Sequence, residues 1–135
     1  MSVLTGMTAP QSAALWSGLL ILLLVILSVR VVLARRKHRV LLGDGGVSQV
    51  TVAGRVFGNA AEYVPTGIGA LALLAMLGMP VIAIHTVGAV LLAGRFIHAI
   101  GLSDRKPTLG RVAGMALTYL ALVAVGAMLV VHAFV

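Results

Sequence analysis

Long apolar runs without charge dominate the chain, and short polar or basic stretches separate them. A helix needs about 20 mostly apolar residues to cross the hydrocarbon core of a bilayer. Runs of this length predict four membrane spans, at about residues 13–34, 51–77, 81–102 and 110–134. No shift in composition marks a second domain. We therefore expect residues 1–135 to form one all-α integral membrane domain, a four-transmembrane-helix bundle.

The basic residues fall on one side of this predicted bundle. Four crossings place every Lys and Arg toward the same membrane face, at Arg30, 35–39, Arg55, Arg95 and 105–111. The positive-inside rule then makes the loops 35–50 and 103–109 cytosolic and leaves both termini outside. We expect a multi-pass protein of a bacterial inner membrane.

Composition excludes several other classes of protein. Hydrophobic residues make up 61% of the chain and charged residues 10%, against about 45–50% and about 25% in soluble domains. The net charge of +7 could suggest nucleic acid, but a basic rim along a membrane is explained by anionic lipid headgroups, so we expect a lipid bilayer and no nucleic acid as partner. Cysteine is absent. A thiol would therefore have to come from a substrate, and no metal site is expected.

A polar stripe interrupts the second predicted span. Arg55, Asn59 and Glu62 are spaced i, i+4, i+7, which puts them on one face of a helix. An ionisable side chain inside the membrane costs at least about 2.5–3.5 kcal/mol, so such residues usually face protein or a water-filled cavity. The stripe is therefore a candidate functional site.

Counting residues from the turn at 78–80 estimates the depth of each position. The count places Glu62 level with Arg95 and Asn59 level with His98, and Arg95 and His98 share a face of the third helix. One interpretation is a structural ion pair between Glu62 and Arg95.

The surplus of positive charge in this cluster favours a ligand site instead. Arg55 lies at the mouth of the cluster, and Arg111 opens the fourth helix nearby. Arginine forks bind carboxylates in two-point contacts, and Glu62 can take an ammonium group. The cluster therefore suits an anionic ligand that also carries an amine.

The same residues resemble a known family. The run Arg55-x-x-x-Asn59-x-x-Glu62-Tyr63-x-Pro65, followed by Gly94-Arg95-x-x-His98, is similar to the membrane-associated proteins in eicosanoid and glutathione metabolism, the MAPEG family. This family includes microsomal glutathione transferases and leukotriene synthases. The segment from Ala34 to Val40 also resembles the end of the first helix in a leukotriene synthase of the family.

The resemblance implies a homotrimer of four-helix subunits that holds glutathione between neighbouring subunits at the cytosolic side. Glutathione would be the co-substrate. The ligand-binding residues on this basis are Arg55, Asn59, Glu62, Tyr63, Arg95 and His98. An arginine at the start of the fourth helix stabilises the glutathione thiolate in the family. Arg111 is the best match for this catalytic role, with Arg105 as the alternative.

The resemblance therefore implies an enzyme that conjugates glutathione to a lipophilic small molecule, or uses glutathione to reduce a lipophilic hydroperoxide. Only the thiolate of a thiol with a pKa near 8.5 is a good nucleophile. Lowering that pKa by about two units needs about 2.7 kcal/mol, which one partly desolvated arginine can supply. The sequence does not identify the electrophile.

Two departures from the family pattern keep other functions open. Leu102 stands where many transferases of the family carry a tyrosine, and Phe57 stands where microsomal transferases carry a histidine. One alternative is a non-enzymatic binding or scaffold protein that keeps the fold. The other is a small membrane transporter that uses Glu62 to couple proton movement to export.

Several other residues carry weaker predictions. His98 is either a general base or a structural histidine, since its ordinary pKa is near 6.5. Interfacial placement explains His85, His132 and Trp16, and a packing role is expected for Tyr119. Two pairs of glycines spaced four residues apart are candidate helix contacts, Gly54 with Gly58 and Gly110 with Gly114.

Overall fold

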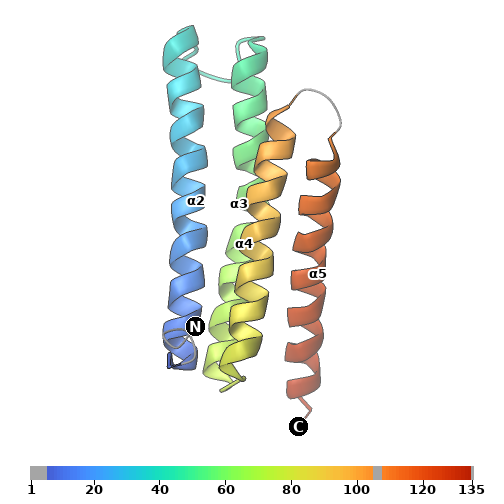
Figure 1. The fold of residues 1–135 in the computed structure, drawn as a ribbon. Coiled ribbons are helices and arrows are strands. Elements are labelled where there is room, and N and C mark those ends of the chain that lie inside the picture. Colours follow the sequence, from blue (N-terminus) through green and yellow to red (C-terminus); the bar gives the residue numbers. More distant parts are fainter. Residues whose placement is uncertain (1–5, 105–107, 135) are drawn as a thin grey trace.

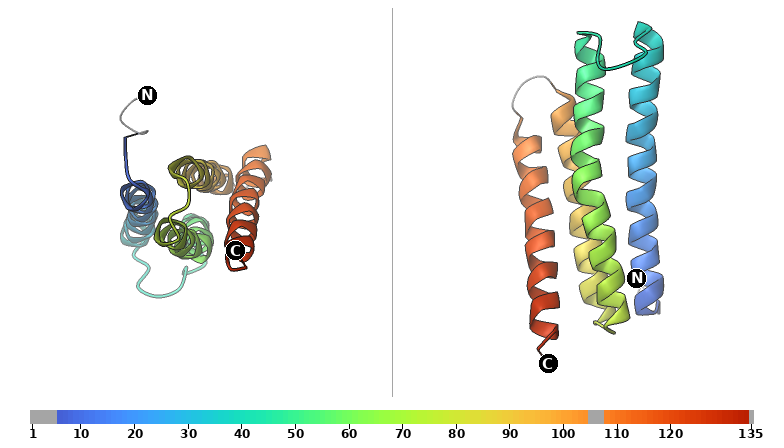
Figure 2. Two further views of the ribbon diagram at one scale, coloured as in Figure 1. Left: turned by 90° about the horizontal axis from the view of Figure 1, so that it is seen from below. Right: turned by 180° about the vertical axis from the view of Figure 1, so that it is seen from behind.

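The computed structural model describes residues 6–104 and 108–134. They form four long helices, α2 (Ala9–His38), α3 (Ser48–Met76), α4 (Val81–Ser103) and α5 (Leu109–His132). Figure 1 shows that each helix runs antiparallel to the one before it in the sequence. The end view in Figure 2 places α3 and α4 in the middle, with α2 and α5 on opposite flanks.

The four helices lie at the four predicted spans, so the predicted helical membrane bundle is confirmed. By length and composition, α2, α4 and α5 are each apolar enough to cross a membrane. α3, which carries Arg55, Asn59 and Glu62, is not among the helices that meet this standard. Pro65 lies inside α3, which continues through it to Met76.

Local signals set the helix ends. Thr8 caps α2: its hydroxyl accepts from the Gln11 backbone N–H, and the Gln11 side chain accepts from the Thr8 backbone N–H. Arg39 ends α2 in the left-handed conformation, with a φ of 56°. Thr108 caps α5 by accepting from the Arg111 backbone N–H. We call the end of the bundle where α2 finishes and α5 begins the basic end.

Asp44 organises the loop between α2 and α3. Its carboxylate accepts hydrogen bonds from the Gly46 backbone N–H at 3.0 Å and from the Thr51 hydroxyl at 2.8 Å. These bonds stabilise the charged form and hold the pKa of Asp44 below its ordinary value. The loop geometry that they support is therefore present near neutral pH and is lost as the pH falls through that lowered value.

Glycines allow α4 and α5 to approach closely at the basic end. A Cβ atom at Gly114 would meet the backbone of His98, and one at Gly101 would meet the backbone of Gly110 and Arg111. Of the two candidate glycine pairs, Gly110 and Gly114 therefore lie at a helix contact. Gly54 and Gly58 have no such neighbour within 4 Å. The close approach sets the start of α5 directly against His98.

Replacing Gly114 with valine is expected to lower the free energy of unfolding by about 3 kcal/mol or more, because the added atoms meet backbone that cannot move aside. Gly126→Val is the matched control, since Gly126 has no neighbour within 4 Å at that position. Thermal unfolding in detergent measures both variants. Equal melting temperatures for the two would contradict this packing.

A hydrogen-bond chain joins α2 to α4 at the opposite end of the bundle. The Trp16 indole N–H donates to Nδ1 of His85 at 2.9 Å, so His85 carries its proton on Nε2. That nitrogen lies 3.2 Å from the Ser12 hydroxyl, which donates in turn to the Thr8 carbonyl. Trp16 also packs over Gly88. Trp16 and His85 therefore connect two helices, a role that interfacial placement alone did not predict.

Candidate functional site

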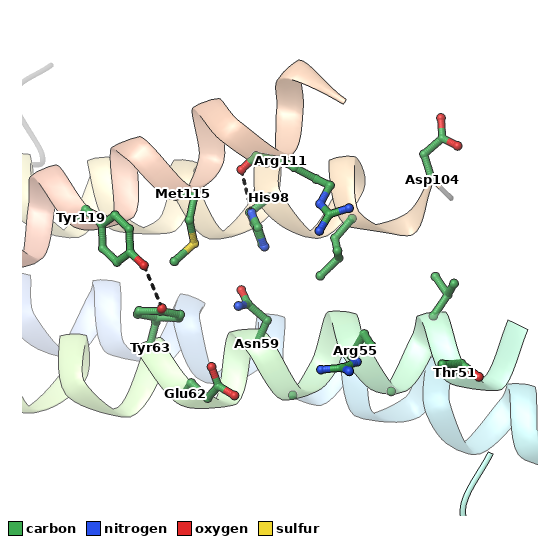
Figure 3. A pocket seen from close by; sticks show the side chains of 14 residues that line it. Thr51, Arg55, Asn59, Glu62, Tyr63, His98, Asp104, Arg111, Met115 and Tyr119 are labelled. Atoms are coloured by element: carbon green, nitrogen blue, oxygen red, sulfur yellow. Dashed lines mark hydrogen bonds between the residues drawn. The ribbon is translucent and has the colours of Figure 1, made fainter. Parts of the chain in front are cut away.

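A groove of about 950 Å³ opens between α3 and α5 in the half of the bundle nearest the basic end. Figure 3 shows the α3 residues on one wall, the α5 residues on the opposite wall and His98 of α4 at the back. The lining residues are Thr51, Val52, Gly54, Arg55, Gly58, Asn59, Glu62, Tyr63, His98, Leu102, Asp104, Arg111, Met115 and Tyr119.

The structure brings most of the predicted site residues together in this groove. The predicted residues that line it are Arg55, Asn59, Glu62, Tyr63, His98 and Arg111. Arg95 lies behind the wall, with 1% of its surface exposed. Arg105, the alternative to Arg111, falls outside the described residues. The catalytic and binding roles of all these residues remain predictions.

Arg95 connects three helices through its guanidinium group. It donates to Oδ1 of Asn59 on α3 at 2.7 Å and to the Thr118 hydroxyl on α5 at 3.0 Å. Its remaining nitrogen lies 3.4 Å from the Met115 sulfur. The guanidinium carbon also lies 5.1 Å from the centre of the Tyr63 ring, a cation–π contact. All four described partners are uncharged.

The bond from Arg95 fixes the orientation of the Asn59 amide. A guanidinium has only donors, so the atom that it holds must be the carbonyl oxygen of Asn59. Within the described residues no hydrogen bond occupies the amide NH₂ of Asn59, so it can donate to a ligand in the groove. Arg95 therefore determines which hydrogen-bonding group the groove presents at this position.

Glu62 and Arg95 do not form the structural ion pair that was one interpretation of the sequence. Arg95 bonds Asn59, and no ion pair links Glu62 to an arginine within the described residues. Counting from the turn estimated depth only, whereas the rotation of α3 about its axis decides which side chain faces α4. That rotation turns Asn59 toward Arg95 and leaves Glu62 on an exposed flank. The structural ion pair considered from sequence is therefore not formed.

His98 links α4 to α5. Its Nδ1 lies 2.9 Å from the backbone carbonyl oxygen of Arg111. A carbonyl oxygen only accepts, so Nδ1 carries the proton in this bond. The ring connects the end of α4 to the start of α5, and Gly114 allows the backbone of His98 to approach α5 closely.

Two tyrosines close the end of the groove away from the basic end. The hydroxyl groups of Tyr63 and Tyr119 lie 3.2 Å apart, and their rings meet edge to face. Tyr119 lines the groove and is 51% exposed. The packing role predicted for it from sequence therefore misses its place in the groove. Arg111, Met115 and Tyr119 are spaced i, i+4, i+8, a pattern that indicates one face of α5.

Electrostatically, the groove combines two cations from opposite walls with two carboxylates, Glu62 and Asp104. Arg55 projects from α3 and Arg111 from α5, and Glu62 lies on the α3 wall with them (Figure 3). Leu102 lines the groove at the position where the family resemblance leads one to look for a tyrosine. The described residues contain no group of three His, Cys, Asp or Glu that could hold a metal ion. The arrangement can bind carboxylates and an ammonium group at once.

Comparison with known proteins places the chain among membrane proteins. The sequence profile of the MAPEG family matches residues 13–131. Inner membrane protein YecN of Escherichia coli K12 is 41% identical over 110 residues, which cover 82% of this chain and 83% of YecN. YecN of Escherichia coli O6:H1 matches to the same extent. No solved structure matches significantly. The length of the profile match and the identity to YecN together show that the chain belongs to the MAPEG family.

Proposed function

We propose that the protein is a membrane enzyme that binds glutathione as co-substrate and joins it to a lipophilic electrophile, or uses it to reduce a lipophilic hydroperoxide. The observation that carries this proposal is the groove, in which Arg55 and Arg111 face each other and Glu62 has no ion pair with the described residues. Membership of the MAPEG family supports a glutathione-related function in general.

Glutathione has the groups that this groove complements: two carboxylates, one ammonium group and one thiol. Arg55 binds a carboxylate, and the Asn59 amide held by Arg95 donates a further hydrogen bond. Glu62 accepts from the ammonium group. Arg111 stabilises the thiolate and so favours the reactive form at neutral pH. No protein nucleophile is required, and the bilayer delivers the apolar second substrate.

The exposed flank of α3 supports a homotrimer. Arg55 and Glu62 are both exposed on the single chain, although charged groups at membrane depth are costly against lipid. Packing of α3 against other copies would remove these charges from lipid and close the open side of the groove. Molecular mass measured in detergent tests the trimer directly.

We also propose an inner-membrane location, as the printed name of YecN states for that protein. The orientation that follows from the basic residues makes the loops 35–50 and 103–109 cytosolic. The groove then opens near the cytosol, where glutathione is available.

Replacing Glu62 with glutamine is expected to weaken glutathione binding about 10-fold, because the ammonium group loses a charged acceptor. An analogue of glutathione that lacks the α-amino group should bind the wild-type protein and the variant equally well. Calorimetric titration of both ligands into both proteins measures this difference. A 10-fold loss for the analogue as well would contradict the contact between Glu62 and the ammonium group.

Leu102 favours a second candidate function, a non-enzymatic binding protein with the same fold. Leucine cannot supply the hydroxyl of the tyrosine that many transferases of the family carry there. Binding of glutathione without turnover of any lipophilic electrophile would support this alternative. Proton-coupled transport of a lipophilic cation, with no glutathione binding, would support the other hypothesis, a small membrane transporter in which Glu62 couples proton movement to export.

A further inference from the structure

His98 is held so that one ring nitrogen is committed to structure and the other is available for chemistry. Nδ1–H donates to the backbone carbonyl of Arg111 at 2.9 Å. In the neutral ring, Nε2 is therefore an acceptor with a free lone pair. His98 lines the groove, and Figure 3 shows this second nitrogen pointing away from the Arg111 carbonyl and toward the α3 wall. No described hydrogen bond occupies Nε2.

The charged and titratable groups around His98 come from all three helices that meet there. Three arginines face two carboxylates, and both of these carboxylates line the groove. The groups are Arg55, Glu62 and Tyr63 on α3, Arg95 on α4, Asp104 directly after α4, and Arg111 and Tyr119 on α5. An anion formed beside His98 would therefore be stabilised as it forms.

We propose that Nε2 of His98 is the general base that takes the proton from the thiol bound in the groove. The assignment rests on the proposed function and deepens it. In this step the S–H bond breaks, an Nε2–H bond forms, and the sulfur keeps the electron pair as a thiolate. The thiolate lies between the imidazolium of His98 and the guanidinium of Arg111, so the negative sulfur separates two cations.

The following step returns the proton. For addition to an electrophilic alkene or an epoxide, an S–C bond forms while the C=C π bond or one C–O bond of the ring breaks. The electron pair of the broken bond moves onto carbon or oxygen of the second substrate. The imidazolium donates its proton to that atom, which restores the neutral histidine. Atoms and charge therefore balance without any further reactant.

His98 and Arg111 have different roles in this step, one as a general base and the other as an electrostatic partner of the thiolate. Arg111 lowers the free energy of the thiolate but cannot accept a proton, since arginine stays charged in proteins. A thiol with an ordinary pKa near 8.5 is mostly protonated at neutral pH, and its proton needs an acceptor within reach. The ordinary pKa of histidine, near 6.5, suits that exchange. The hydrogen bond from His98 to the Arg111 carbonyl fixes the position of the base relative to the residue that carries the cation.

The variant His98→Asn separates these functions. The asparagine amide can still donate to the Arg111 carbonyl, so the link between α4 and α5 is kept, but it has no basic nitrogen. We expect glutathione affinity to change less than about 3-fold and the conjugation rate to fall about 10²-fold. His132→Asn is the matched control, because His132 is exposed near the end of α5, far from the groove. It should leave the rate unchanged.

Proton release gives a readout that a merely structural histidine would not move. Calorimetry in buffers of different ionisation enthalpy counts the protons released when glutathione binds, and ultraviolet absorbance counts the thiolate formed. Wild-type protein should form thiolate with about zero protons released to the buffer, because His98 keeps the proton. His98→Asn should release about one proton for each thiolate that it forms.

The wild-type measurement alone can overturn the assignment. Release of one full proton per thiolate by the wild-type protein would show that His98 does not accept it, even if the variant failed to fold. An unchanged pH profile of the conjugation rate in a folded His98→Asn variant would overturn it too. Absence of glutathione binding by the wild-type protein would overturn the proposed function itself, which is a distinguishable result.

Discussion

Replacing Arg111 with alanine is expected to lower the conjugation rate about 10²-fold, because the developing thiolate loses its positively charged neighbour. Arg111 lies on the α5 wall of the groove, and its backbone carbonyl holds His98. Substitution removes the guanidinium and leaves that carbonyl in place. Ultraviolet absorbance of bound thiolate should be lost at neutral pH and should return as the pH approaches the ordinary thiol pKa.

Arg30→Ala is the matched control for this experiment. Arg30 is exposed on α2, where it donates to the Ser103 hydroxyl at the basic end and does not line the groove. Its removal also lowers the net positive charge by one, but should leave the thiolate signal intact. If Arg111→Ala kept full thiolate absorbance at neutral pH, Arg111 would not be the residue that stabilises the thiolate.

Replacing Arg95 with methionine is expected to weaken glutathione binding about 10- to 100-fold while changing stability little. The Asn59 amide is no longer held with its NH₂ toward the groove, and the site loses a nearby positive charge. Stability is spared because burying a cation among uncharged partners carries a large desolvation cost, which methionine removes. Thr118 still donates to the Gly114 carbonyl in the variant.

Two measurements decide this prediction: calorimetric affinity for glutathione and the melting temperature in detergent. Lys37→Met is a suitable control, since Lys37 is exposed in the last turn of α2. A purely structural Arg95 would give the opposite pattern, a large loss of melting temperature with little change in the intrinsic affinity of the folded protein.

Periodicity and charge were sufficient to predict the four helices. Apolar runs of spanning length are a strong signal, because the bilayer admits few other backbone arrangements. The turn at 78–80 was also readable, since Gly78 adopts a positive φ of 65° there. Helix spacing likewise predicts that Arg55, Asn59 and Glu62 share one face of a helix.

The pairing of side chains across helices was not readable in the same way. Sequence spacing gives the relative angle of residues on one helix but not the rotation of that helix against its neighbour. Asn59 rather than Glu62 therefore meets Arg95, and no spacing rule pointed to Thr118 as a further partner. The protonated nitrogen of His98 depends on a carbonyl of another helix, which sequence does not reveal.

The position of Tyr119 could be predicted only in part from the sequence. Its spacing from Arg111 and Met115 contains the signal for one face of α5, but nothing in the sequence shows that this face lines a groove. The hydrogen bond with Tyr63 joins residues 56 positions apart and exists only in the folded bundle.

Calorimetric titration of glutathione into the purified wild-type protein in detergent tests the central claim most directly. A groove with Arg55, Arg111 and Glu62 on its walls should give a saturable heat of binding. The glutathione analogue without the α-amino group should bind more weakly. Absence of saturable heat at about millimolar glutathione would contradict the account.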